Sequence, residues 1–352
     1  MQRSLWVVVA LALSTSQAFS AEMITRRRDK PLSGDVTGVS KTEVTVKVKT
    51  PKEETIKVPA NVVQSITWTG ESPEAILARA DESGGRYQKA IDAYQKAIQG
   101  AKAANALAKV DLEYGIARSR GKLALTDASQ LDEAIKKLEE FRSKQGDHYR
   151  FYEAVGLLGQ LYLAKKDIAK AQAAFETLGK APWKESQLAS KIAMGRLLLA
   201  DDKPDEAVTA FDAVIGQPAD GPQEESQRQE AMIGKVRVLL NQKKFEEAQK
   251  LLEEVIDKAD PEDARVNAEA WLRLGDCLRE QGKDKDALLA YLHIDVLYAT
   301  EKSMQAEALF HLTRLWEKVG QKGRAAEARD KLEGDEFKGS EWARQLKGQA
   351  AG

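Results

Sequence analysis

The sequence contains a single cysteine, Cys277, and only three histidines. One cysteine excludes an intramolecular disulfide, and no cysteine stands beside the N-terminal apolar segment, so a lipoprotein is not expected. Cys277 lies in a helical pattern, where we expect a buried structural thiol. The histidines are His148, His293 and His311, and their spacing matches no common metal motif. We therefore expect no metal site.

Common catalytic and phosphate-binding motifs are also absent. The chain has no G-x-S-x-G, no G-x-G-x-x-G and no H-E-x-x-H, and Leu123 follows Lys122 where a phosphate loop needs Ser or Thr. Carboxylate pairs such as Glu139-Glu140 have the spacing of a solvated helix face. We therefore expect no enzyme activity and no cofactor. One alternative stays open, an envelope glycan hydrolase, because two carboxylates can suffice for glycoside hydrolysis.

Aromatic residues are scarce, at 6% of the chain against 43% hydrophobic residues in total. The apolar content is mainly Ala and Leu, which favours closely packed helices over a β-rich core. The formal net charge is −1. A charge this small gives no reason to expect a nucleic acid or an anionic membrane as the partner.

The N-terminus has the organisation of a secretory signal peptide. Arg3 precedes an apolar run from Leu5 to Leu13, and small residues lead to a predicted cleavage after Ser20. The run is shorter than the roughly 20 residues that cross a bilayer. We therefore expect a soluble, exported chain, periplasmic or secreted, with no integral membrane segment after cleavage.

Residues 21–70 are expected to form a small β module. Val44, Val46 and Val48 alternate with polar residues, and this period of two is typical of half-buried strands. Glycine and proline divide the segment into four or five strands that resemble an Sm-like or SH3-like barrel. Sm-like domains often bind RNA, and Arg26-Arg27-Arg28 is a basic cluster, so binding of nucleic acid or an anionic polymer is a second alternative.

The remaining sequence repeats one pattern of small and apolar residues. Trp271-Leu272-Arg273-Leu274-Gly275 is followed by Ala287 and Tyr291, and similar spacings start near Leu158 and Met194. Such self-similarity indicates a repeat array. Corresponding alanines predict seven helical hairpins, and they occupy positions 90, 134, 171, 207, 248, 287 and 325.

This pattern resembles the signature of the tetratricopeptide repeat family. The resemblance implies a mainly α protein, an α-solenoid of about seven hairpins preceded by a small antiparallel β module. The predicted divisions are a signal peptide at 1–20, the β module at 21–70, the repeats at 71–334, and a C-terminal capping helix and tail at 335–352. The final stretch is similar to bacterial envelope proteins of this family, including the cell-division coordinator of the Tol-Pal system.

In this family the first helices of the hairpins form a concave groove, and the residue after the Leu-Gly position projects into it. The resemblance therefore implies a groove for a protein partner in the cell envelope, or for a second copy of the chain. The lysine and asparagine set that clamps a C-terminal carboxylate is missing, so we expect a folded partner or an extended acidic segment. The groove candidates are Gln160, Arg196, Lys235, Asp276 and Arg314, with Glu153, Ile192, Leu272 and Phe310 beside them.

Overall fold

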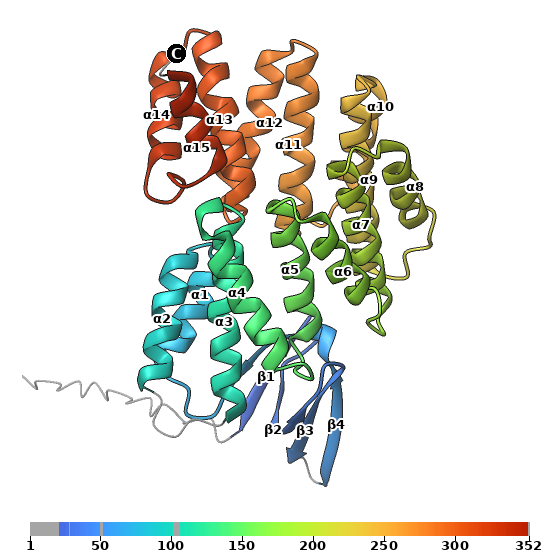
Figure 1. Cartoon of the computed structure of the whole chain (residues 1–352), viewed down its shortest axis with the longest axis vertical. Helices are drawn as coiled ribbons and strands as arrows, with labels where there is room; N and C mark the ends of the chain where they lie inside the picture. The colour runs from blue at the N-terminus through green and yellow to red at the C-terminus, as the bar shows by residue number, and fades with distance from the viewer. Residues whose placement is uncertain (1–20, 28, 50–51, 101–105, 351–352) are drawn as a thin grey trace, which may run out of the picture.

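The computed structural model describes residues 21–27, 29–49, 52–100 and 106–350. Within these ranges the chain forms a small sheet followed by a long series of helices (Figure 1). The predicted signal peptide and Arg28 lie outside the described residues. Among the helices described, none is both long enough and apolar enough to cross a lipid bilayer.

The sheet has five antiparallel strands in the order β4-β3-β2-β1-β5. The side chains of Val44, Val46 and Val48 are buried and those between them are less so, as the alternation predicts. These valines pack with Ile66 and Trp68 to form the core of the module. The strands are β1 (Glu22–Arg26), β2 (Leu32–Val39), β3 (Glu43–Lys49), β4 (Glu53–Pro59) and β5 (Val63–Thr67), with the 3-10 helix η1 (Ala60–Val62) before β5.

In the described part of the chain, fourteen helices pair into seven hairpins, which confirms the predicted solenoid. The first helices of the hairpins are α1 (Pro73–Ser83), α3 (Ala106–Ala124), α5 (Phe151–Ala164), α7 (Lys184–Ala200), α9 (Pro222–Asn241), α11 (Ala264–Glu280) and α13 (Lys302–Lys318). The second helices are α2 (Tyr87–Gly100), α4 (Leu131–Lys144, after the 3-10 helix η2, Ala128–Gln130), α6 (Ile168–Leu178), α8 (Pro204–Ile215), α10 (Phe245–Lys258), α12 (Asp284–Leu297) and α14 (Lys322–Glu333).

The two helices of a hairpin approach closely where glycine faces an aromatic ring. A Cβ added to Gly195 would lie 2.6 Å from Cε1 of Phe211, and one added to Gly275 would lie 2.6 Å from Cε1 of Tyr291. Both rings are fully buried. Because protein interiors are close-packed, a larger residue at either glycine would push the helices apart.

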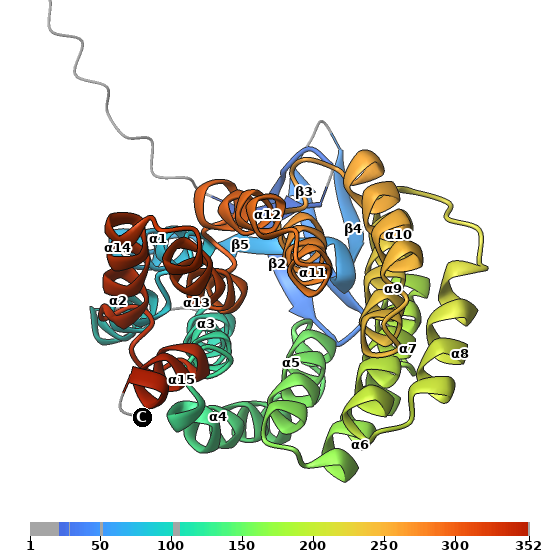
Figure 2. The same cartoon turned by 90° about the horizontal axis from the view of Figure 1, so that it is seen from above.

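The hairpins curve into a superhelix whose first helices lie toward the inside (Figure 2). The last hairpin, α13-α14, lies over the first hairpin, α1-α2, in both views (Figures 1 and 2). The two ends touch, because a Cβ added to Gly85 would lie 2.9 Å from the carbonyl oxygen of Thr300. A last helix, α15 (Glu341–Ala350), packs on the final hairpin, where the Trp342 ring lies 5.2 Å from that of Phe310.

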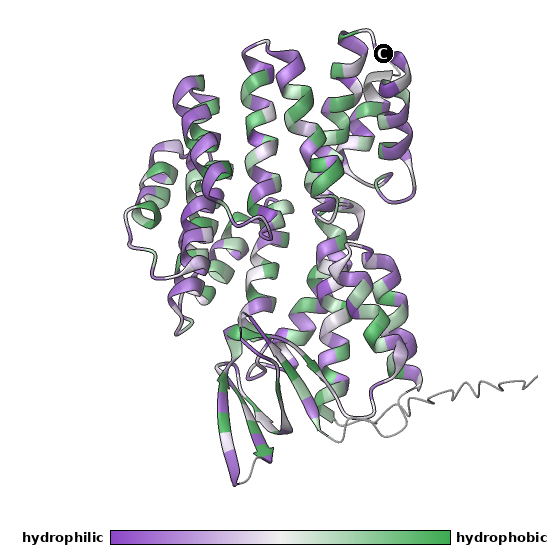
Figure 3. Ribbon diagram, turned by 180° about the vertical axis from the view of Figure 1, so that it is seen from behind, coloured by the Kyte–Doolittle hydropathy of each residue, from purple (hydrophilic) through white to green (hydrophobic). Residues whose placement is uncertain are grey.

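Hydrophobic segments of the ribbon lie where helices face one another, and hydrophilic segments follow the outward faces (Figure 3). Cys277 is buried within α11, as the sequence predicts. The β module joins the repeats through its own core, which includes Tyr149. The indole Nε1 of Trp68 also donates a hydrogen bond of 3.2 Å to Asp111 of α3. The sheet is therefore held against the first hairpins.

Candidate functional site

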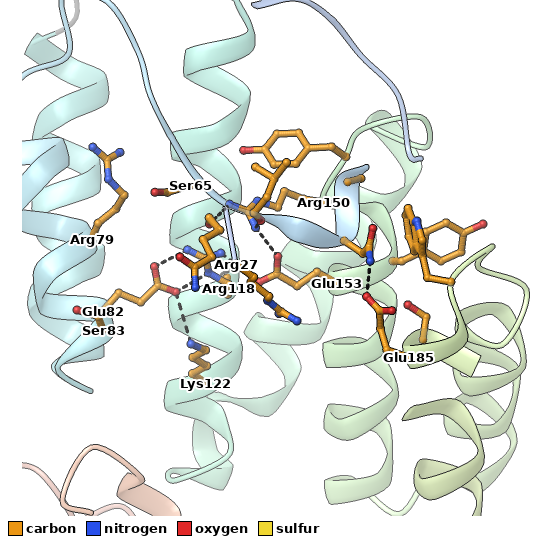
Figure 4. Close-up of a pocket in the computed structure, with 18 of the residues that line it drawn as sticks. Arg27, Ser65, Arg79, Glu82, Ser83, Arg118, Lys122, Arg150, Glu153 and Glu185 are labelled. Carbon is orange, nitrogen blue, oxygen red and sulfur yellow. Dashed lines mark hydrogen bonds and ion pairs between the residues drawn. The ribbon is translucent and has the colours of Figure 1, made fainter. Parts of the chain in front are cut away.

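A cavity of about 850 Å³ lies between the β module and the inner face of the repeats (Figure 4). One wall is formed by η1 and β5, and the other by α1, α3, α5 and the start of α7. The contributing segments are far apart in the sequence. The site therefore depends on how the sheet sits on the helices.

The sheet wall is mainly polar. Ser65 and Thr67 are two residues apart on β5 and share a face of the strand, while Ile66 between them is fully buried in the module core. Arg27 follows β1 and has an exposed side chain. At one end the Asn61 amide donates a hydrogen bond to the Glu185 carboxylate of α7, which closes the wall against the repeats.

The helix wall is a network of charges centred on Arg118 of α3. Its guanidinium donates to both carboxylate oxygens of Glu82 in α1, at 2.6 and 2.7 Å. A third bond of 3.1 Å reaches Glu153 of α5. Lys122 lies one turn further along α3, and its Nζ is 4.0 Å from Glu82. Arg118 thus links three successive hairpins.

Arg150, just before α5, ties this network to the sheet. It donates to Glu153 at 2.8 Å and to the carbonyl oxygens of Val63 at 3.3 Å and Gln64 at 2.6 Å. Gln64 lies at a β-bulge, since Ser65 pairs with Thr25 and Val63 pairs with Arg26. A bulge interrupts the regular pairing and locally reorients the strand. The Gln64 carbonyl is in this way available to Arg150.

Both carboxylates of the network are held in the ionised form. Burial alone would raise the pKa of Glu153, but Arg150 and Arg118 outweigh burial and lower that pKa to about 2. Burial likewise opposes ionisation of Glu82, and Arg118 again overcomes it, so its pKa is lowered. The network therefore carries fixed negative and positive charges at neutral pH.

A second set of charges lines the inner face further along the superhelix. We call it the inner ion-pair cluster. Arg196 of α7 donates to Glu269 of α11 at 2.9 Å, and Arg265 of α11 pairs with Glu230 of α9. The cluster comprises Arg196, Glu230, Arg265, Glu269, Arg273, Asp276 and Glu307, so that it spans four hairpins.

The C-terminal end of this cluster brings His311 near Asp276 and Glu307, with ligand atoms within 4.8 Å of one another. Arg273 already binds both carboxylates, the second at 3.0 Å. Burial lowers the pKa of His311 to about 4, so the ring is neutral at pH 7. Because Arg273 already pairs with both carboxylates, we interpret the group as an ion-pair network.

Comparison with protein families decides the class of the repeats. The tetratricopeptide repeat model matches residues 123–182 and 233–301, which cover parts of the second, third, fifth and sixth hairpins. The chain contains tetratricopeptide repeats. Arrays of such repeats form extended concave surfaces that bind other proteins, so this chain is a scaffold for protein interaction.

Solved structures share the tetratricopeptide fold at low sequence identity. The Rap conjugation gene regulator of plasmid pLS20, in complex with the Phr* peptide, is 16% identical over 74% of this chain and 73% of the regulator, with a TM-score of 0.52. PilW, a type IV pilus biogenesis factor, is 17% identical over 69% of this chain and 99% of its own, with a TM-score of 0.42. No curated protein sequence matches the chain at a significant level.

The tetratricopeptide geometry brings some of the predicted groove residues together. Arg196 and Asp276 belong to the inner ion-pair cluster, and Glu153 belongs to the cavity network. Gln160 lies two turns after Glu153 on α5 and has an exposed side chain. Arg314 is exposed on α13, with its guanidinium 5.5 Å from the centre of the Phe310 ring.

Three of the predicted apolar contacts are wrong. Ile192, Leu272 and Phe310 are 2%, 0% and 2% exposed, so none of them offers a surface to a partner. Each fills the core between tetratricopeptide helices. The helical pattern places these residues next to the groove, but their side chains point into the core and not to the accessible surface.

Lys235 is also displaced from the predicted strip. Its Nζ lies 2.8 Å from Asp212 of the outer helix α8. The neighbouring Gly234 packs against Phe211 of the preceding hairpin, where an added Cβ would lie 2.4 Å from Cε1 of the ring. The residue after this glycine therefore points back toward α8, whereas Glu230 is the α9 residue that joins the cluster.

Sequence reasoning missed Arg27, Arg118, Lys122 and Arg150 as neighbours in one site. Arg118 and Lys122 are four residues apart on α3, a spacing that places them on one helix face. That spacing was a usable signal. The contributions of Arg27 and Arg150 depend on the docking of the β module, for which the sequence has no local pattern.

Proposed function

We propose that this protein is an exported, non-enzymatic scaffold of the bacterial cell envelope that binds a partner protein through the inner surface of its repeats. The observation that carries the proposal is the set of charged side chains on the first helices of successive hairpins, from Glu82 of α1 to Glu307 of α13. The Rap regulator, with the same fold, was solved with a peptide bound. Concave repeat surfaces bind partners of extended shape.

Export is supported by the N-terminal sequence alone. A basic residue, the apolar run from Leu5 to Leu13 and small residues before Ala21 have the order of a cleaved signal. N-terminal sequencing of the chain recovered from a periplasmic fraction should begin at Ala21. A chain that retains Met1 in the cytoplasm would overturn this part of the proposal.

The cavity carboxylates favour binding over hydrolysis. A glycosidase needs one acid whose pKa is raised so that it can protonate the leaving group. The pKa values of Glu82 and Glu153 are instead lowered, because arginines surround both. These two residues are suited to hold charge and not to deliver protons.

A photo-crosslinking residue at Gln160 tests the proposed surface directly. Gln160 is exposed on the inner helix α5, and Gln172 is also an exposed glutamine, on the outer helix α6 of the same hairpin. In living cells the residue at position 160 should yield a discrete adduct with a second protein, while that at position 172 should not. Equal labelling from both positions would contradict the inner-surface assignment.

A further inference from the structure

We propose that the cavity between the β module and the repeats binds an extended acidic segment of the partner protein, with Arg27 and Lys122 meeting its carboxylates. The inference rests on the proposed function and adds the β module to the binding site. A volume of about 850 Å³ falls within the range of about 300–1,000 Å³ that is usual for ligand sites.

The cationic side chains of the cavity differ in whether a carboxylate of the chain already pairs with them. Arg79 donates to Glu71, and Arg118 and Arg150 hold the carboxylates of Glu82 and Glu153. These three arginines are already neutralised at short range, which leaves them little capacity for an incoming anion.

Two other cationic side chains that line the cavity lack a close carboxylate partner in the described part of the chain. Among the described residues, Arg27 has no ion pair through its side chain, and Lys122 approaches Glu82 only at 4.0 Å. The ammonium of Lys122 also lies 5.8 Å from the centre of the Tyr87 ring. Arg27 comes from the sheet wall and Lys122 from the helix wall. Carboxylates that enter between the walls would complete charge-assisted hydrogen bonds with these two cations.

The apolar part of the lining favours a polypeptide over a small inorganic anion. Ile76 of α1 is 56% exposed and faces the cavity, although large apolar side chains are usually covered. The Tyr152 and Trp183 rings also line it, in an edge-to-face pair with centres 5.7 Å apart. A chain segment with acidic and apolar side chains would use both kinds of surface.

Fluorescence anisotropy with labelled peptides and the full mature chain tests this site. The main probe is a short Glu-rich peptide that contains leucine and has an amidated C-terminus. In the second peptide Gln replaces Glu, which removes the negative charge. The third peptide consists of Ala and Leu and has a free C-terminus, so that the terminal carboxylate is its only anionic group. Binding of the first peptide, but not of the second, supports the proposal, and the third shows whether a terminal carboxylate alone is sufficient.

The variants Arg27→Gln and Lys122→Gln should each weaken binding of the charged peptide by about tenfold, as expected for loss of one charge-assisted bond. Lys52→Gln and Lys89→Gln are matched controls, since both lysines are exposed and line no part of the cavity. Ser65→Trp, which fills the cavity from β5, should also abolish binding. Unchanged far-UV circular dichroism verifies that each variant is folded.

Three results would overturn the inference: no peptide binds, the Gln peptide binds as well as the Glu peptide, or the control variants weaken binding as much as Arg27→Gln and Lys122→Gln. The Gln160 crosslink reports separately on the proposed function. If no peptide binds but the Gln160 adduct forms, the cavity site is refuted while the scaffold remains in place.

Discussion

The cavity and the inner ion-pair cluster both line the inner surface, yet two cations of the cavity are partnered differently from those of the cluster. In the cluster, Arg196 and Arg273 each contact two carboxylates. In the cavity, Arg27 and Lys122 lack a carboxylate within hydrogen-bonding distance among the described residues. The cluster therefore holds hairpins to one another, whereas the cavity also retains two charges that an external group can satisfy.

The difference shows that charge on a concave surface is not by itself a binding signal. Truncating one partner of a buried ion pair leaves the other charge uncompensated, so such pairs resist change. A cation without a partner has no such structural role. Substitutions in the cluster should accordingly change stability, and substitutions of Arg27 or Lys122 should change binding.

The largest effect is expected from Arg273→Ala in the cluster. The Arg273 side chain is 14% exposed and binds Asp276 and Glu307, so its loss leaves two carboxylates close together and unneutralised. We expect a loss of about 3 kcal/mol in the free energy of unfolding, measured by urea denaturation at pH 7. Lys122→Ala should change it by less than about 0.5 kcal/mol. Similar losses in the two variants would remove the distinction between the regions.

Much of the fold could be predicted because each hairpin depends on local spacing. Gly195 and Phe211 lie at the same separation as Gly159 and Phe175, and both glycines do meet those rings. Spacing does not say whether a glycine faces its own hairpin or the preceding one. Gly234 contacts Phe211 of the preceding hairpin, and for this reason the assignment of the residue after it failed.

The site was less predictable because its parts converge only through tertiary packing. The pairing of Arg150 with Gln64 joins residues 86 positions apart, and it depends on a bulge that the strand pattern does not reveal. Glu153 was identified from the repeat geometry, but its arginine partners were not. Local periodicity predicts which face a side chain occupies, whereas ion pairing depends on which segments meet across that face.

A smaller, pH-dependent effect is expected from Glu153→Gln in the cavity. The folded pKa of Glu153 is about 2, below its ordinary value of 4.5. The ionised carboxylate therefore stabilises the fold above about pH 4.5, and this contribution is lost as the pH falls toward 2. Its size should be about 1 kcal/mol or less, because the side chain is 41% exposed and solvent screens the pair.

Urea midpoints measured from pH 7 to pH 3 check this prediction. The wild type should be more stable than Glu153→Gln at pH 7, and the gap should narrow below about pH 4.5. Glu54→Gln is the control, since Glu54 is exposed on β4 and has no ion pair in the described part of the chain. A gap that stays constant with pH would show that the arginines do not stabilise the ionised form.

The smallest effect on stability is expected at Lys235. This residue follows the repeat glycine in sequence, but its ammonium pairs with the outer helix α8. Lys235 and Asp212 form an ion pair in which the side chains are 30% and 47% exposed. Exposed pairs contribute about 0.5 kcal/mol or less, so Lys235→Gln should leave the urea midpoint nearly unchanged. Because the ammonium points toward α8, the Gln160 crosslink should also persist in this variant. Loss of the adduct would mean that the partner reaches the outer helices as well, and that the inner surface is only part of its footprint.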